Sequence, residues 1–196
     1  MVRVPTSFAS QWIAPRLDLF RSEHPDIDLR LTALDQGDSK IDVEIRFGMG
    51  EWPRYESTLL LRDEAFPVCA PQYALKLHVP GDLGAGDLLH VPGYDEDWDT
   101  WLGHVGVHDI DTAAGSFFDQ SIMAIRAAVE GKGVLLGRSA LVERELASGL
   151  LVAPFSQRLQ ANGSYWLLVT PQKAKSAKVA AFKEALLRMT RSAQPI

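Results

Sequence analysis

The pattern of hydrophobic and polar residues predicts an amphipathic helix near the N-terminus. Large apolar residues recur there at nearly helical spacing: Phe8, Trp12, Leu17 and Phe20. Ser7 lies where an N-cap is expected, with a hydroxyl that accepts hydrogen bonds from free amides of the first turn. Pro15 removes one helical hydrogen bond and predicts a kink or a new turn. The pair His24-Pro25 then predicts the end of the helix.

A period of two predicts strands after this helix. Residues 27–31 and 41–47 alternate apolar with polar side chains, which is typical of half-buried strands. Residues 59–61 and 65–70 predict further strands, and Pro71 marks a crossover after them. Trp98 lies in an acidic segment that predicts a short helix.

Helical and strand patterns then alternate to the end of the chain. The predicted elements are a helix at 121–130 ended by Gly131, a strand at 134–136, a helix at 139–147, strands at 150–155 and 165–169, and a helix at 178–190. This alternation indicates an α/β protein. A departure near Cys69 and a return near Tyr165 predict two α/β lobes joined by two crossover strands.

Composition narrows the possible functions. A hydrophobic content of 46% and a charged content of 23% are those of an ordinary globular protein. The formal charge of −5 argues against a nucleic-acid surface, because DNA affinity depends on neutralising phosphates with Lys and Arg. The single cysteine, Cys69, fits a reducing cytoplasm and lies in an apolar segment, which favours a buried, inert thiol. The acidic residues at 95–97 and 99 are interpreted as a solvated surface.

The order of motifs in residues 6–48 is similar to one known family. A hydroxyl-rich turn, Thr6-Ser7-Phe8, opens the helix, a His-Pro break ends it, and two alternating strands follow. This order resembles the effector-binding domain of LysR-type transcriptional regulators, and within them the subgroup of the glycine-cleavage activator and the chromosomal β-lactamase regulator. One departure is the 33–41 connection, which is shorter than in the family and makes that wall of the cleft uncertain.

The resemblance implies a type 2 periplasmic-binding-protein-like fold. Residues 1–69 with 166–196 are expected to form lobe I, and residues 70–165 lobe II. The N-terminal winged helix-turn-helix DNA-binding domain is expected to lie outside this chain. The implied function is sensing of a small, anionic metabolite in an interlobe cleft, in the cytoplasm, by a homodimer or homotetramer that binds DNA only through the missing domain. Leu19 and Ile27 are expected to contribute to antiparallel pairing of the domains.

Residues that could contact an effector fall at helix starts, strand ends and crossings. Helix N-termini favour anions, which selects Thr6, Ser7 and Phe8 at the first helix and Asp119 and Ser121 at the second-lobe helix. Ser7 is either a ligand contact or only an N-cap. Asp119 is interpreted mainly as a helix cap, or otherwise as a reader of an amino group.

The remaining candidates also have two readings each. Thr32 matches a polar cleft position of the family, or is an exposed strand-end threonine. Arg46 either clamps a carboxylate or pairs internally with Asp42, Glu44 or Asp119. Four aromatic residues are candidates for a cleft wall or for core positions: Phe66, Trp98, Phe118 and Tyr165.

Other chemistries are not supported by motifs. His104 and His108 have a metal-ligand spacing on a helix, but Gly103 and Gly106 disfavour a helix there and no third ligand is near. No serine-hydrolase elbow or dinucleotide motif is evident. We therefore expect no cofactor, no metal and no enzymatic activity. The alternatives are a solute-binding protein of a transporter with the same fold, and an enzyme built on that fold.

Overall fold

The computed structural model describes residues 1–34 and 40–192, and these divide into two compact units. Unit 1 comprises residues 1–62 and 163–196, and unit 2 comprises residues 63–162. The strands β4 (Glu56–Val68) and β8 (Leu159–Val169) run from one unit into the other. Both unit boundaries lie a few residues earlier in the chain than the expected ones at 69 and 165. The shortened connection falls largely on residues 35–39, outside the described residues.

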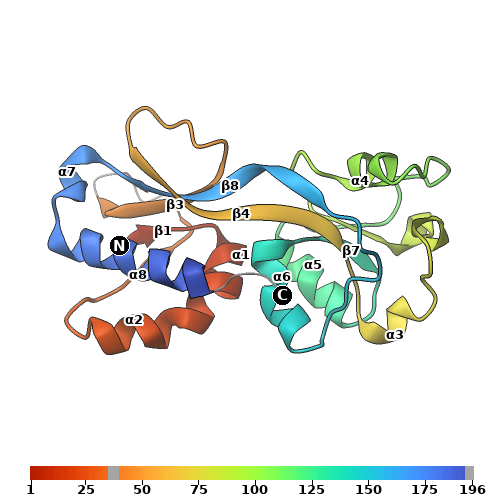
Figure 1. The fold of residues 1–196 in the computed structure, drawn as a ribbon, viewed down its shortest axis with the longest axis horizontal. Coiled ribbons are helices and arrows are strands. Elements are labelled where there is room, and N and C mark those ends of the chain that lie inside the picture. Colours follow the sequence, from red (N-terminus) through yellow and green to blue (C-terminus); the bar gives the residue numbers. More distant parts are fainter. Residues whose placement is uncertain (35–39, 193–196) are drawn as a thin grey trace. The chain divides into compact units, whose positions relative to one another are not determined.

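Unit 1 contains a mixed sheet with the strand order β2-β1-β3-β8, of which Figure 1 labels β1, β3 and β8. Strand β1 (Val2–Arg3) is parallel to β2 (Leu31–Thr32) and to β3 (Val43–Gly48). Strand β8 is antiparallel to β3. Helices α2 (Leu17–Glu23) and α8 (Ala177–Ser192) lie below these strands in Figure 1, and the short α7 (Pro171–Ala174) precedes α8. Phe20 of α2 packs edge-on against Phe182 of α8, which closes the core of this unit.

The first helical segment is broken as Pro15 predicts. A three-residue α1 (Thr6–Phe8) passes into a π-helix at Ala9–Ile13, then a 3-10 turn at Ala14–Arg16, and then α2. Because proline has no N–H, it cannot donate the bond that a continuous α-helix would need at residue 15.

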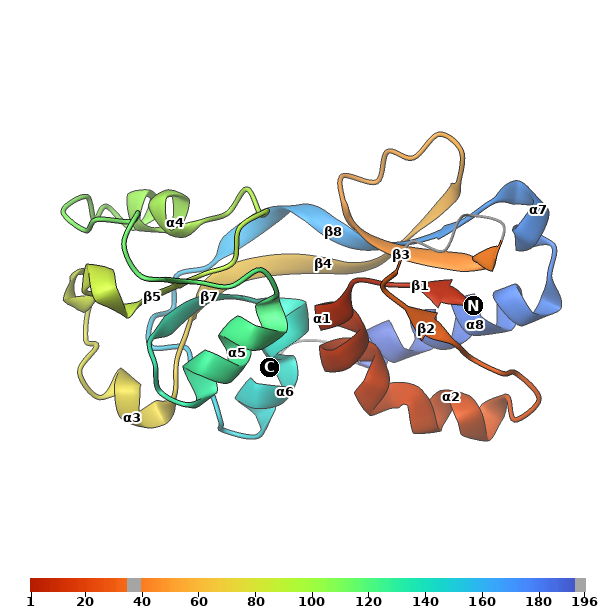
Figure 2. The same cartoon turned by 180° about the vertical axis from the view of Figure 1, so that it is seen from behind.

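Unit 2 has the strand order β4-β7-β5-β6. Strand β7 (Val134–Arg138) is antiparallel to β4, whereas β5 (Leu88–His90) is parallel to both β7 and β6 (Ser116–Phe117). Helices α5 (Ser121–Val129) and α6 (Ser139–Ala147) lie beside β7 in Figure 2. The short α3 (Pro71–Ala74) and α4 (Trp98–His104) complete the unit, and Trp98, Trp101 and Leu88 are buried in its core.

Two predicted strands are wrong in extent. The segment 27–31 contributes only Leu31 to a two-residue strand, and 150–155 contributes only Val152, which forms an isolated bridge with Cys69. Ile27 and Leu29 are half-buried between exposed neighbours, so the alternation records burial without ladder hydrogen bonds. Conversely, the two predicted strands at 59–61 and 65–70 form one continuous β4.

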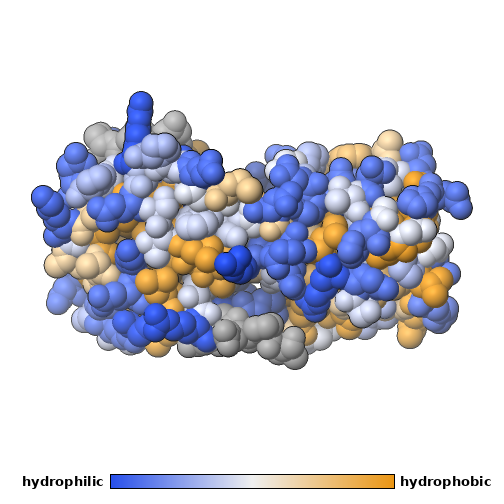
Figure 3. Space-filling model, turned by 45° about the horizontal axis from the view of Figure 1, so that its top comes forward, coloured by the Kyte–Doolittle hydropathy of each residue, from blue (hydrophilic) through white to orange (hydrophobic). Residues whose placement is uncertain are grey.

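No helix within residues 1–34 and 40–192 is both long enough and apolar enough to cross a membrane. Hydrophilic side chains are interspersed with hydrophobic ones over the face drawn in Figure 3. The large apolar side chains that are exposed belong to many different elements: Leu19, Leu34, Met49, Leu75, Val79, Phe117, Met123 and Leu150. Leu19 is 52% exposed and Ile27 is half-buried, and their expected pairing with a second copy stays a prediction.

Candidate functional site

The start of the first helix differs from the expectation at Ser7. Pro5 is the N-cap of α1, no side chain caps the helix, and Ser7 is its second residue. The proline ring fixes its own φ, which is −56° here, and α1 begins at the next residue, Thr6. Ser7 is 7% exposed and Thr6 is exposed. The N-cap reading of Ser7 is therefore wrong, and a ligand contact by its hydroxyl stays a prediction.

Phe8 and Tyr165 come together in unit 1. Their rings stack with centroids 4.2 Å apart, although they lie on the first helix and the last strand. Phe8 also stacks on Trp12 at 5.2 Å, and Phe47 packs edge-on against Tyr165 at 5.1 Å. Tyr165 is 2% exposed, so this aromatic cluster holds the start of α1 against β8.

Arg46 belongs to a charged cluster on the strands of unit 1. Its guanidinium donates to Glu44 Oε2 from Nε at 2.6 Å, and Arg3 Nη1 donates to Glu44 Oε1 at 2.8 Å. The internal pairing with Glu44 is thus confirmed, whereas Asp42 instead pairs with Lys173. Two guanidinium groups donate to one buried carboxylate. The Arg46 side chain is 38% exposed, so its guanidinium is accessible to an anion.

Thr32 lies in register with this cluster. Thr32 pairs with Arg3 across β1 and β2, and Arg3 pairs with Glu44 across β1 and β3, so the three side chains share one face of the sheet. The Thr32 hydroxyl oxygen accepts a hydrogen bond from the Leu34 N–H at 3.1 Å. Thr32 therefore has a local structural role that does not exclude ligand contact.

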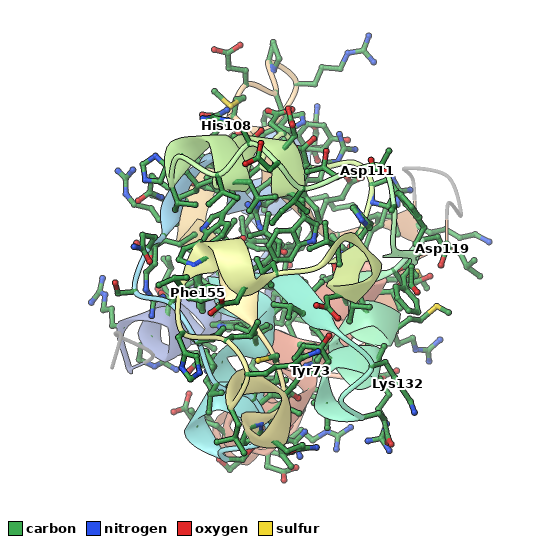
Figure 4. All side chains as sticks on the ribbon, turned by 90° about the vertical axis from the view of Figure 1, so that its right-hand side faces the viewer. Tyr73, His108, Asp111, Asp119, Lys132 and Phe155 are labelled. Atoms are coloured by element: carbon green, nitrogen blue, oxygen red, sulfur yellow. The ribbon has the colours of Figure 1, made fainter. Side chains whose placement is uncertain are left out.

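Unit 2 places Ser121 at the start of α5. Its hydroxyl is 3.2 Å from the hydroxyl of Tyr94, and Ser121 is 7% exposed. The N-cap is Gln120, and no side chain caps the helix, so the reading of Asp119 as a cap is wrong. Asp119 is exposed before the helix start, and Figure 4 labels it there with Lys132 beyond the other end. Phe118 is half-buried, and its N–H donates to the His90 carbonyl at 2.9 Å.

Two of the aromatic candidates are core residues of unit 2. Phe66 is 1% exposed, with the Arg158 guanidinium 3.9 Å from its ring centroid. Trp98 is 2% exposed, and its Nε1–H donates to the Leu89 carbonyl at 3.1 Å. Neither ring offers a surface to a ligand, because core packing and the indole hydrogen bond already occupy them.

A buried charge network in unit 2 was missed by the sequence reasoning. Arg138 donates from Nε to Asp63 Oδ2 at 2.9 Å and from Nη1 to Glu96 Oε2 at 2.7 Å. The three residues are at most 7% exposed, so the reading of the whole acidic run as a solvated surface is wrong at Glu96. The available signal was a charged residue at the end of the otherwise apolar strand β7, namely Arg138, whereas Asp63 lies between two other charged residues of β4 and carried no such signal.

The network sets the ionisation of its members. Burial alone would raise the pKa of Glu96, but hydrogen bonds from Arg138 and from the Asn162 N–H, with the charge of Arg138, lower this pKa below its ordinary value. Burial opposes the charge of Arg138 as well, but the two carboxylates raise the pKa of its guanidinium. Arg138 and Glu96 are therefore both charged at neutral pH.

Other reactive groups in the described parts of the chain are inert. Burial raises the pKa of Cys69 to about 11, so its thiol stays protonated at neutral pH, as expected for a core cysteine. Within residues 1–34 and 40–192, no group of three or more His, Cys, Asp or Glu side chains could hold a metal ion. His104 ends α4 and Gly106 follows with a φ of +76°, so His108 does not continue that helix.

Comparison with known proteins identifies the family. The family model described as the LysR substrate binding domain matches residues 2–191. The glycine cleavage system transcriptional activator of Escherichia coli K12 is 34% identical over 188 residues, which cover 92% of this chain and 61% of that protein. The chain thus spans about 61% of the length of this curated relative.

Solved structures show the same fold. The effector domain of the regulator AmpR from Pseudomonas aeruginosa has a TM-score of 0.82 and 32% identity, covering 97% of this chain and 94% of that one. The AmpR effector binding domain from Citrobacter freundii has a TM-score of 0.83 and 26% identity, covering 97% of both chains. These matches confirm the predicted type 2 periplasmic-binding-protein-like α/β fold, and the chain belongs to the LysR substrate-binding domain family.

Proposed function

We propose that this chain is the effector-binding regulatory domain of a LysR-type transcriptional regulator. It senses a small anionic metabolite in the cytoplasm, and the regulator binds DNA through a winged helix-turn-helix domain outside this chain. The regulator works as a homodimer or homotetramer. The observation that carries this proposal is the match of the family model across residues 2–191, together with the effector domains among its structural neighbours.

The preference for an anion rests on Arg46. Its guanidinium is partly exposed while it also pairs with the buried Glu44. A guanidinium presents parallel N–H groups that match a carboxylate, and such charge-assisted bonds are stronger than neutral ones. The effector class is therefore a carboxylate, an amino acid or a related metabolite.

Polar groups within each unit are further candidates for effector contact. In unit 1 these are the hydroxyls of Thr6, Ser7 and Thr32. In unit 2 they are Ser121 and its neighbours Phe118 and Asp119. No ring contact is proposed for Phe8, Tyr165, Phe66 or Trp98, because each is at most 2% exposed.

Two rival functions receive less support. A solute-binding protein of a transporter has the same fold, but the matched relatives are transcriptional activators. An enzyme would need a positioned acid, base or nucleophile. The buried carboxylates Asp63 and Glu96 are instead engaged by Arg138, so no catalytic role is proposed for them.

The test is ligand binding by the wild-type chain and paired variants. Thermal shift against a panel of amino acids and small dicarboxylates should identify a stabilising compound, because a ligand that binds only the folded state raises its stability. Calorimetry should then show that Arg46→Gln weakens binding about 10- to 100-fold, the value of a lost charge-assisted hydrogen bond. Arg30→Gln is the matched control, since Arg30 is 69% exposed and pairs only with its neighbour Asp28 in the described contacts. Equal loss in both variants, or no stabilisation by any anion, would contradict the proposal.

A further inference from the structure

Arg138 is the common partner of groups from several elements of unit 2. It is the last residue of β7 and is 3% exposed. Its Nε donates to Asp63 on β4, and its Nη1 donates to Glu96 in the loop before α4. Separating this guanidinium from two buried carboxylates would leave uncompensated charge, so the three groups stay paired when any one of them shifts.

Asp63 and Glu96 also contact the strands that pass between the units. Asp63 is the first residue of unit 2 on β4, and Asn162 is the last residue of unit 2 on β8. The Asn162 N–H donates to Glu96 Oε1 at 2.7 Å, and Gln160 Nε2 donates to the Asp63 carbonyl at 2.8 Å. Arg138 therefore fixes β4 and β8 at the points where each strand enters or leaves unit 2.

The Asp63 carboxylate carries this support into α6. Its Oδ1 accepts hydrogen bonds from the Ser139 hydroxyl at 2.6 Å and from the Ala140 N–H at 3.1 Å, at the start of that helix. The Glu64 N–H donates to Ser139 Oγ at 3.1 Å. The amides of Glu64, Ala140 and Asn162 thus report directly on whether the network is intact.

On its other side, Arg138 supports the pair Tyr94 and Ser121. The guanidinium carbon lies 4.5 Å from the centroid of the Tyr94 ring, a cation–π contact. The Tyr94 hydroxyl is 3.2 Å from Ser121 Oγ, at the start of the nine-residue α5. A continuous set of contacts therefore runs from Ser121 through Tyr94 and Arg138 to both crossing strands.

We propose that Arg138 is a positioning residue that couples effector contact at the Tyr94–Ser121 hydroxyl pair to the two crossing strands. Tyr94 is then a further effector-proximal residue, which the family match and the sequence reasoning do not assign. The inference rests on the proposed effector-binding function. A carboxylate that takes hydrogen bonds from Ser121 or Tyr94 shifts the Tyr94 ring on the guanidinium. Because buried charges must stay paired, Asp63 and Glu96 follow that shift.

The variants separate the hydroxyl from the ring. Tyr94→Phe removes the hydroxyl next to Ser121 and keeps the ring on Arg138, whereas Tyr94→Leu removes both. Tyr73→Leu is the matched control, because Tyr73 is also a half-buried tyrosine of unit 2, with Lys76 Nζ 3.9 Å from its ring centroid and Asp87 at its hydroxyl. Figure 4 labels Tyr73. Arg138→Lys keeps the charge but cannot reach both carboxylates from one planar fork.

The first arm needs no ligand. Amide hydrogen exchange, resolved by residue, should be roughly 2- to 30-fold faster at Glu64 and Asn162 in Tyr94→Leu, the range that a cation–π contact contributes. Arg138→Lys should show the same change, whereas Tyr94→Phe and Tyr73→Leu should not. Equal acceleration in Tyr73→Leu, or none in Tyr94→Leu, would overturn the coupling.

The second arm adds glycine or acetate as the probe. In the wild type, either probe should slow exchange at the start of α5 and also at Glu64 and Asn162. In Tyr94→Leu, protection at α5 should persist while protection at Glu64 and Asn162 is lost, a change that mere loss of stability does not produce. Protection retained at all of these sites would overturn the coupling and leave the proposed function standing. If neither probe protects the wild type anywhere, the effector proposal loses its support, and the ligand-free arm still decides the coupling.

Discussion

Replacing Arg138 with methionine should destabilise the protein far more than removing a surface arginine. In the native structure this guanidinium lies 2.9 Å from Asp63 and 2.7 Å from Glu96, whose side chains are 0% and 5% exposed. Breaking a buried ion pair by removing one partner costs about 3–5 kcal/mol. Asp63 keeps donors from Ser139 and Ala140, so the loss should fall near the lower end, at about 3 kcal/mol of unfolding free energy.

Urea unfolding at neutral pH, followed by circular dichroism, measures this loss. The control is Arg126→Met, because Arg126 pairs with Glu130 on the surface of α5 and its side chain is 75% exposed. That substitution should cost less than about 0.5 kcal/mol. A second variant in the Arg138→Met background replaces Asp63 with Asn and Glu96 with Gln. It should recover much of the stability, because no buried charge is left without a partner.

A cost of under about 1 kcal/mol for Arg138→Met would refute this prediction, since the carboxylates would then not depend on the guanidinium. Further destabilisation of the Arg138→Met protein on neutralising Asp63 and Glu96 would refute it as well. That result would mean that hydrogen-bond geometry, rather than charge balance, dominates the network.

Three further predictions follow from individual sites. The pKa of Glu96 in the folded state lies below its ordinary value of 4.5, so its contribution to stability is complete above pH 4.5 and is lost as the pH falls through the lower folded-state pKa. The free energy of unfolding should therefore fall less steeply with decreasing pH in Glu96→Gln than in the wild type, as urea unfolding at a series of acidic pH values would measure. Cys69 has a pKa of about 11 and is fully buried, so an aromatic disulfide reagent should label it at neutral pH only after urea unfolds the protein, and rapid labelling of the native state would contradict its burial. Gly163→Ala should lower the free energy of unfolding by about 1 kcal/mol, because the added Cβ would lie 2.5 Å from Phe47 Cε1. Gly81→Ala is the control, since no atom lies within 4 Å of its added Cβ, and equal melting temperatures of the two variants would refute the prediction.

Local pattern was sufficient for the helices of unit 2. The predicted helix at 139–147 has those bounds in the structure, and the one predicted at 121–130 ends at Val129 with Gly131 at a φ of +70° beyond it. The apolar face and the glycine stop are both encoded within a few residues, which is why the pattern suffices.

Candidate site residues were harder to assign. Ser121 was selected because it begins a helix, but its partner Tyr94 lies 27 positions away and carries no motif. Trp98 and Phe66 are candidates for an aromatic cleft wall by residue type alone, and their burial depends on packing that no local pattern encodes. Arg46 had three plausible carboxylate partners in the sequence, and it pairs with Glu44 because residues two apart on β3 share one face of the sheet.

The sequence by itself determined the α/β class, the family resemblance and most helix positions, because each depends on the periodicity of neighbouring residues. It did not determine which charges are buried together. Asp63 and Arg138 are separated by 75 positions, and Glu96 reaches the same guanidinium from a loop that reads as an exposed acidic run. Only the antiparallel pairing of β4 with β7 brings Asp63 near Arg138, and only burial makes their pairing energetically necessary.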